Sequence, residues 1–220
     1  RSSGNETMQT DQLIAMLARD PEPVPAGVVR RRHAQALGWG LAGSAILMAI
    51  FLGVRPDLSE ASRLPMFWAK LALPLVLLLV AVAGAARLSR PGVALGRVAA
   101  IVPLPVVAIW ALAAVVLLAA APPERVSLLF GGTWNTCPFN IAFLSAPFFV
   151  GAFWAMKGLA PTRLALAGAF AGLMAGAAGA LVYCLHCAEM SPAFIGTWYL
   201  LGIAIPALAG ALLGPRLLRW

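Results

Sequence analysis

Charged side chains are scarce in this sequence, and acidic ones are the scarcest. Only 11% of the 220 residues are charged, and 8 Asp and Glu stand against 16 Lys and Arg. Hydrophobic residues make up 61% and the mean hydropathy is +0.88, whereas soluble domains are roughly 45–50% apolar. This composition excludes an ordinary soluble domain and indicates an all-α integral membrane protein.

Mid-membrane charge is missing as well, because no long apolar run has an Asp, Glu or His near its centre. Ionisable residues at that depth are expensive and are retained for transport or proton relays. Their absence disfavours an ion or solute carrier, including a metal permease. Lys70 lies in the first turn of the second run. We expect it either to extend its ammonium toward the membrane surface or to pair with Asp57 or Glu60.

The chain also lacks a signal peptide after its first methionine, because residues 8–29 are polar and contain prolines. Residues 1–7 precede Met8 and read as a remnant of cloning, so we expect the natural numbering to begin at Met8. We therefore divide the chain into this remnant, a cytoplasmic segment over residues 8–33 and a membrane bundle over residues 34–220.

Long apolar runs are the most abundant feature that is present. A membrane-spanning helix needs about 20 mostly apolar residues, and six runs meet this requirement: Ala34–Val54, Phe67–Ala86, Val98–Ala121, Phe139–Met156, Leu164–Leu185 and Phe194–Leu213. Short connections favour antiparallel neighbours, so we predict a six-helix transmembrane bundle.

Small residues and prolines predict details of the packing. Glycines at positions 168, 172 and 176, and again at 210 and 214, recur every four residues, a spacing that lets helix backbones approach closely. We expect the fifth helix to be the central element. Pro103 and Pro105 predict a bend in the third helix, because proline removes a backbone hydrogen bond.

The distribution of Lys and Arg predicts the orientation of the bundle. One set of connections holds eleven, namely Arg19, Arg30, Arg31, Arg32, Arg87, Arg90, Arg97, Lys157, Arg163, Arg216 and Arg219, and the other holds four, namely Arg55, Arg63, Lys70 and Arg125. Both termini are therefore predicted to be cytoplasmic. The net charge of +8 then reflects orientation and contact with the lipid bilayer, and we expect no direct nucleic-acid binding.

Cysteine is rare, and this topology places all three residues at the extracytoplasmic side. Cys137 lies in the third connection and Cys187 in the fifth, beside His186, with Cys184 about one turn inside. Three arrangements remain open from the residues alone. Cys137 can pair with Cys187, Cys184 can pair with Cys187, or the reduced cysteines can bind a heavy-metal or zinc ion together with His186.

Each of these residues also has a simpler interpretation, because membrane cysteines are often inert and His186 can be an interfacial polar residue. A membrane thiol-quinone oxidoreductase is the competing function. Such an enzyme usually needs two redox pairs, which three cysteines cannot form. We therefore expect a protein that is not an enzyme and requires no cofactor.

The cytoplasmic segment contains one short amphipathic helix. Thr10 and Asp11 offer an N-cap, and Leu13, Ile14 and Leu17 fall on one face before a proline-rich stretch ends the pattern. A two-turn helix is marginal alone in water. It can bury its apolar face against the membrane surface or in the groove of a cytoplasmic partner.

The chain contains a set of short motifs, in this order: Asp11-Gln12-Leu13-Ile14, Arg55-Pro56-Asp57-Leu58, Phe67-Trp68-Ala69-Lys70, Cys137-Pro138, Leu185-His186-Cys187, Ser191-Pro192 and Gly196-Thr197-Trp198-Tyr199. In these motifs the sequence resembles the NrsF-type membrane anti-sigma factors. Proteins of that family are negative regulators that hold an extracytoplasmic-function sigma factor at the bacterial inner membrane. The resemblance extends from Met8 to the end of the chain.

The resemblance implies a cytoplasmic N-terminal segment that binds the sigma factor and two extracytoplasmic cysteines that respond to heavy metals or oxidants. By position these sensor cysteines are Cys137 and Cys187, and Cys184 is an addition to the family pattern. It further implies that a change at the two cysteines moves the fourth and fifth helices. The bundle then transmits this motion to the first helix, and the sigma factor is released.

Overall fold

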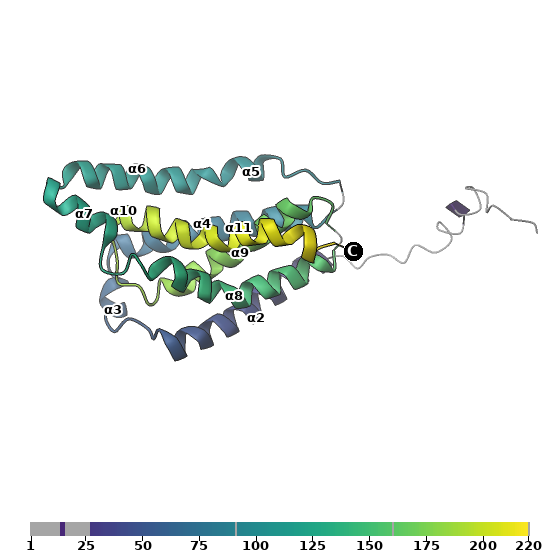
Figure 1. Ribbon diagram of the computed structural model, residues 1–220, viewed down its shortest axis with the longest axis horizontal. Helices are drawn as coiled ribbons and strands as arrows, with labels where there is room; N and C mark the ends of the chain where they lie inside the picture. The colour runs from purple at the N-terminus through teal and green to yellow at the C-terminus, as the bar shows by residue number, and fades with distance from the viewer. Residues whose placement is uncertain (1–13, 16–26, 91, 160, 220) are drawn as a thin grey trace, which may run out of the picture.

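The computed structural model describes residues 14–15, 27–90, 92–159 and 161–219 (Figure 1). These residues form helices joined by turns, and the described part of the chain contains no strand. Six helical segments are long and apolar enough to cross a membrane. The predicted all-α bundle of six candidate spans is therefore confirmed.

The six segments follow the apolar runs closely. They are α2 (Val28–Phe51), α4 (Pro65–Leu88), α5 and α6 together (Arg97–Ile101 and Pro103–Ala119), α8 (Cys137–Lys157), α9 (Leu164–Tyr183), and α10, the π-helix η1 and α11 together (Pro192–Phe194, Ile195–Tyr199 and Leu200–Leu217). Helix α2 begins at Val28, before the apolar run at Ala34, so residues 28–33 of the expected cytoplasmic segment continue the first long helix.

Two short helices, α3 (Leu58–Ala61) and α7 (Pro122–Phe130), lie in the connections. Figure 1 shows both at one end of the bundle, together with the connection between α9 and α10. The start of α2 and the C-terminal end of α11 lie at the opposite end. We call these the connection end and the terminal end of the bundle.

Helix α9 occupies the centre, because 72% of its apolar window is buried. Its glycines allow close packing against α11. A Cβ atom on Gly168 would collide with the carbonyl oxygen of Gly210, and one on Gly172 would collide with that of Pro206. The predicted small-residue packing and the central position of the fifth helix are confirmed.

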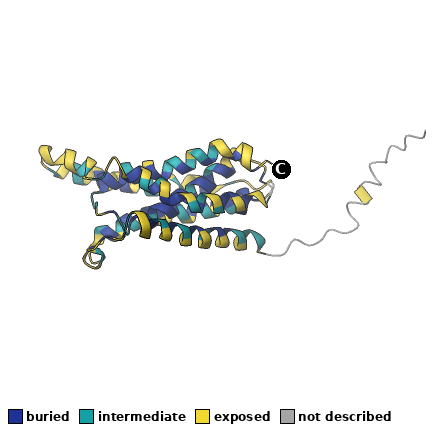
Figure 2. Cartoon of the chain, turned by 60° about the horizontal axis from the view of Figure 1, so that its bottom comes forward, coloured by how far each residue is buried: buried dark blue, intermediate teal, exposed yellow. Residues whose placement is uncertain are grey.

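Helix α2 packs against α8 by the same device. A Cβ atom on Gly151 would lie 2.9 Å from the carbonyl oxygen of Ala36, and one on Gly40 would collide with the ring of Phe148. Buried residues concentrate where helices face each other, and exposed residues lie on the outward faces (Figure 2). Helix α2, which follows the N-terminal segment, therefore packs directly against α8, which begins with Cys137.

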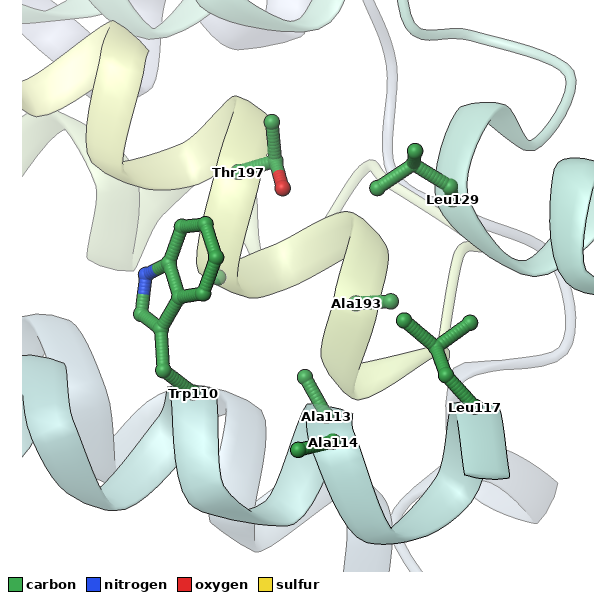
Figure 3. A pocket seen from close by; sticks show the side chains of 8 residues that line it. Trp110, Ala113, Ala114, Leu117, Leu129, Ala193 and Thr197 are labelled. Atoms are coloured by element: carbon green, nitrogen blue, oxygen red, sulfur yellow. The ribbon is translucent and has the colours of Figure 1, made fainter. Parts of the chain in front are cut away.

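The third span is the most peripheral, with only 11% of its apolar window buried. It is interrupted at Val102, just before Pro103 and Pro105, as the prolines predict. A cavity of about 420 Å³ separates α6 from α7 and η1 (Figure 3). Its lining is apolar apart from the Thr197 hydroxyl and the Trp110 indole N–H, so the cavity holds no group suited to acid, base or thiol chemistry.

Candidate functional site

The three cysteines are positioned by helix ends at the connection end of the bundle. Cys137 is the first residue of α8, and its N–H donates to the carbonyl of Thr133 at 2.9 Å. Cys184 directly follows α9, and the N–H of Cys187 donates to the carbonyl of Tyr183 at 3.0 Å. All three thiols are buried and unbridged.

The structure brings these thiols into one cluster with the two tyrosines of the chain. The side chains of Cys137 and Cys187 lie next to each other, although one residue begins α8 and the other follows α9. The Tyr183 side chain also lies close to Cys137. The Tyr199 hydroxyl is buried without a hydrogen-bond partner among the described residues, and it lies near the sulfur atoms of Cys184 and Cys187.

Lys70 is the charged member of this site. Its side chain is fully buried, and its ammonium donates to the carbonyl oxygens of Cys187 at 2.6 Å and Glu189 at 2.9 Å. The ammonium also lies 5.1 Å from the centre of the Tyr199 ring, a cation–π contact. The expectations that Lys70 reaches the membrane surface or pairs with Asp57 or Glu60 are both wrong.

The helical register explains why Lys70 points inward. Phe67, Leu73, Pro74 and Leu77 are also buried on α4. They stand three, four and seven residues from Lys70, so all of them share one face of the helix. That face packs against the centre of the bundle, so Lys70 is buried together with these apolar side chains.

Arg55 joins the end of α2 to the cysteine segment. Its guanidinium makes two hydrogen bonds to the Asp57 carboxylate at 2.6 and 2.7 Å, the one ion pair among the described residues. Its Nη1 also donates to the carbonyl of Cys187 at 3.3 Å, and its N–H donates to that of Leu185 at 3.0 Å. The hydrogen bond from Arg55 lowers the pKa of the Asp57 carboxyl.

His186 and Glu189 make further links between connections. The Nδ1 atom of His186 lies 2.9 Å from the carbonyl oxygen of Gly53, at the end of α2. The Glu189 carboxylate accepts a hydrogen bond from the N–H of Gly132 at 2.7 Å. Gly131 has a φ of 55°, and a Cβ atom there would lie 2.6 Å from the Glu189 carboxyl carbon, so glycine suits this position on both counts.

The candidate ligand set for a metal gathers only in part. Cys137, Cys184 and Cys187 lie in one cluster, whereas the paired ring nitrogen of His186 faces Gly53. In the part of the chain that the structure describes, no group of three or more His, Cys, Asp and Glu side chains is arranged to hold a metal ion. The cluster is better described as thiols, phenols and a buried ammonium.

The electrostatics distinguish the two cysteines of the last connection. A hydrogen bond from the Cys137 side chain lowers the pKa of the Cys187 thiol. Burial opposes this effect, while the Lys70 ammonium, the Tyr199 hydroxyl and the N–H of Glu189 add to it. Burial raises the pKa of the Cys184 thiol to about 12. Cys187 is therefore the more acidic of the two.

The predicted partner-binding residues are described only in part. Ile14 is helical and 57% exposed, while Leu13 and Leu17 lie outside the described residues. Sequence reasoning missed the site roles of Lys70, Arg55 and the two tyrosines. One available signal was that a chain with only two tyrosines places one beside Cys184 and the other in the last motif.

Comparisons with known proteins give consistent results. The family NrsF, negative regulator of sigma F, matches residues 17–220. The probable anti-sigma-F factor NrsF of Azospira oryzae is 50% identical over 213 residues, covering 97% of this chain and 100% of that protein. The anti-sigma-F factor NrsF of Caulobacter vibrioides is 37% identical over 219 residues, covering 97% and 100%. Both relatives are named as regulators rather than enzymes, and no solved structure matches the chain.

Proposed function

This chain belongs to the NrsF family of negative regulators of sigma F, and we propose that it is a thiol-controlled anti-sigma factor of the bacterial inner membrane. In this proposal its N-terminal segment sequesters an extracytoplasmic-function sigma factor in the cytoplasm. Oxidation of Cys137 and Cys187 on the opposite side of the membrane releases that factor.

The observation that carries the proposal is the contact between Cys137 and Cys187. These side chains come from different connections, yet they lie next to each other in a buried cluster. A disulfide between them would remove two protons and two electrons and would tie the start of α8 to the segment after α9. Such a bond would change the relative position of elements that are now joined only by non-covalent contacts.

Two direct routes lead from this cluster to α2. One runs along α8, which begins at Cys137 and packs against α2 through Gly40 and Gly151. The other runs through Arg55 and His186, which join the end of α2 to residues 185–187. Because α2 follows the N-terminal segment in the chain, these contacts support a signal that passes from the thiols to the sigma-binding residues.

The sigma-binding surface is the amphipathic face of the N-terminal segment. Leu13, Ile14 and Leu17 are the proposed anchors on the basis of their spacing. The exposed position of Ile14 is compatible with this role. The partner in this proposal is a protein, and the lipid bilayer is the only other component that the mechanism requires.

Cysteine substitutions test the proposal. In cells with a reporter for the sigma factor, Cys137→Ser and Cys187→Ser, alone or together, should abolish the increase in transcription that an oxidant causes. Neither serine variant can form the inter-element bond. The matched control is Cys184→Ser, which should keep the response. A double variant whose reporter responds normally would overturn the proposal.

The same reporter separates an oxidant from a thiol-binding heavy metal, the second stimulus that we propose to test. A disulfide mechanism predicts that hydrogen peroxide produces a Cys137–Cys187 bond detectable by mass spectrometry without reductant. Cadmium cannot itself oxidise thiols, so a response to cadmium with both cysteines still reduced would assign the stimulus to metal binding instead.

A further inference from the structure

The site contains a buried charge that has no carboxylate to balance it. Lys70 is fully buried on a candidate span, and no Asp or Glu lies within ion-pair distance of its ammonium in the part of the chain that the structure describes. Two carbonyls and an aromatic ring solvate the ammonium, but they supply no negative charge. A cation in this position is unfavourable unless it is paired.

The charged groups around Lys70 identify what can balance it. Asp57 is paired with Arg55, and the Glu189 carboxylate accepts the N–H of Gly132. The remaining ionisable groups facing the ammonium are the thiols of Cys137, Cys184 and Cys187 and the hydroxyl of Tyr199. Thiols ionise more readily than phenols, so the counter-charge must come from a cysteine.

The geometry selects Cys187 among the three. Its own carbonyl accepts the shortest hydrogen bond from Lys70, which fixes the ammonium beside this residue. Its sulfur also lies close to the side chains of Cys137 and Tyr199 and to the N–H of Glu189. A cation held beside a thiol by the carbonyl of the same residue favours the thiolate over the neutral thiol.

From this arrangement we infer that Lys70 is a positioning residue of the thiol site: its unpaired ammonium stabilises the thiolate of Cys187 and makes Cys187 the thiol that reacts first. The inference rests on the proposed function for its biological meaning, but its chemistry is independent of the sigma factor. Arg55 lies near the same carbonyl, yet its charge is already balanced by Asp57.

The consequence is an ordered reaction with a peroxide, the oxidant class we assign. The Cys187 thiolate attacks one peroxide oxygen, the O–O bond breaks, and hydroxide leaves as a sulfenic acid forms. The sulfur of Cys137 then attacks the Cys187 sulfur, the S–O bond breaks and water leaves, so that the two cysteines lose two electrons in total. The disulfide is neutral, which leaves Lys70 without its counter-charge.

Loss of that counter-charge gives oxidation a second effect besides the new bond. Removing one partner of a buried ion pair is strongly unfavourable. The ammonium holds α4 to the carbonyls of residues 187 and 189, so the released charge favours separation of α4 from this segment. The switch is then driven by charge as well as by the geometry of the disulfide.

The test measures thiol reactivity in the purified full-length protein in lipid nanodiscs, without any sigma factor. Methyl methanethiolsulfonate, a small reagent that attacks thiolates, is applied from pH 4 to pH 10, and peptide mass spectrometry follows modification of Cys187. The wild-type midpoint should lie below the ordinary thiol pKa of about 8.5. A wild-type midpoint at or above that value would overturn the inference without any variant.

Substitutions of Lys70 separate the effect of its positive charge from the effect of its hydrogen bonds. Lys70→Gln keeps a hydrogen-bond donor but loses the charge, and it should slow modification of Cys187 at pH 7 by about tenfold or more, since a rise of one unit in pKa reduces the thiolate about tenfold. Lys70→Arg should restore much of the rate. The matched control, Arg63→Gln, removes an exposed arginine just before α4 that makes no ion pair or side-chain hydrogen bond among the described residues, and it should change the rate less than about threefold.

The outcomes are distinct. A Lys70→Gln protein that elutes as wild type in size exclusion and keeps the wild-type midpoint contradicts the role of Lys70. Equal effects of Lys70→Gln and Arg63→Gln also contradict it, because they would indicate general disruption. A failed cysteine reporter experiment, by contrast, would overturn the proposed function and leave these rates unaffected.

Discussion

At the scale of single residues, the connection end is organised around backbone carbonyls rather than carboxylates. The carbonyl of Cys187 accepts hydrogen bonds from both Lys70 and Arg55, and the carbonyl of Gly53 pairs with His186. A cation on α4 and another after α2 therefore converge on the residue that bears the reactive thiol. A chemical change that moves Cys187 therefore alters contacts of both α4 and the segment after α2.

The ion pair of Arg55 and Asp57 predicts a specific pH dependence. The pKa of Asp57 is lower in the folded protein, so its stabilising contribution is present above the unfolded pKa of about 3.9 and is lost as pH falls through the folded pKa. Asp57→Asn should therefore lower the melting temperature by a constant amount between pH 5 and 8, and this difference should shrink below about pH 4 and disappear only once the pH lies below the folded pKa.

Thermal unfolding in detergent micelles, followed by circular dichroism, measures this difference. Glu60→Gln is the control, because the Glu60 carboxylate has no ion pair or side-chain hydrogen bond among the described residues. A difference between Asp57→Asn and wild type that persists unchanged at pH 3 would show that the carboxylate charge is not what stabilises the connection.

The residues of the candidate site were predictable from the sequence only where the type of side chain itself indicates reactive or metal-binding chemistry. Thiols and an imidazole near helix ends identified Cys137, Cys184, Cys187 and His186. The role of Lys70 was not predictable, because its partners are carbonyl groups 117 and 119 positions away. Every residue has a carbonyl, so no side-chain pattern indicates which ones a lysine will reach.

At the scale of helices, close approach between backbones determines the core. Gly172 on α9 contacts the backbone of α11 at Pro206 and Ala207. Gly172→Ala should force these helices apart and destabilise the bundle by about 1–3 kcal/mol, the usual range for overpacking. The measurement is the unfolding free energy in mixed micelles with increasing denaturing detergent.

The control for this substitution is another glycine in a span. A methyl group added to Gly38 on α2 would have no atom within 4 Å, so Gly38→Ala meets open space. It should leave stability unchanged or raise it by up to about 1 kcal/mol, because alanine favours helix more than glycine does. Equal losses from both substitutions would mean that close packing of α9 on α11 is not the cause.

Element boundaries were predictable within a few residues where hydropathy changes sharply, as at Leu164 of α9. The short helices α3 and α7 and the π-helix Ile195–Tyr199 were not predicted. The π-helix lies inside a continuous apolar run, and its sequence differs little from that of an ordinary helix. It contacts α6 and α8, and such contacts between distant segments are not contained in a local pattern.

At the scale of the whole molecule, the length of the bundle separates the thiol cluster from the start of α2 and the end of α11. The start of α8 and the connection after α9, which carry the cysteines, lie at the connection end, while the start of α2 and the end of α11 lie at the terminal end (Figure 1). Hydropathy alone predicted six spans because an apolar bilayer requires continuous runs. The direction of insertion depends on an excess of cations in alternate connections, which the fold itself does not record.

Reagent access to the two ends tests that direction. Ser59 is exposed at the connection end and Thr162 at the terminal end. In spheroplasts, a membrane-impermeant maleimide should label Ser59→Cys without lysis and Thr162→Cys only after lysis. The unsubstituted chain serves as the blank, since its own thiols are buried. Labelling in the reverse order would place the thiol cluster in the cytoplasm, where reductants keep cysteines reduced, and would remove the basis for sensing an external oxidant.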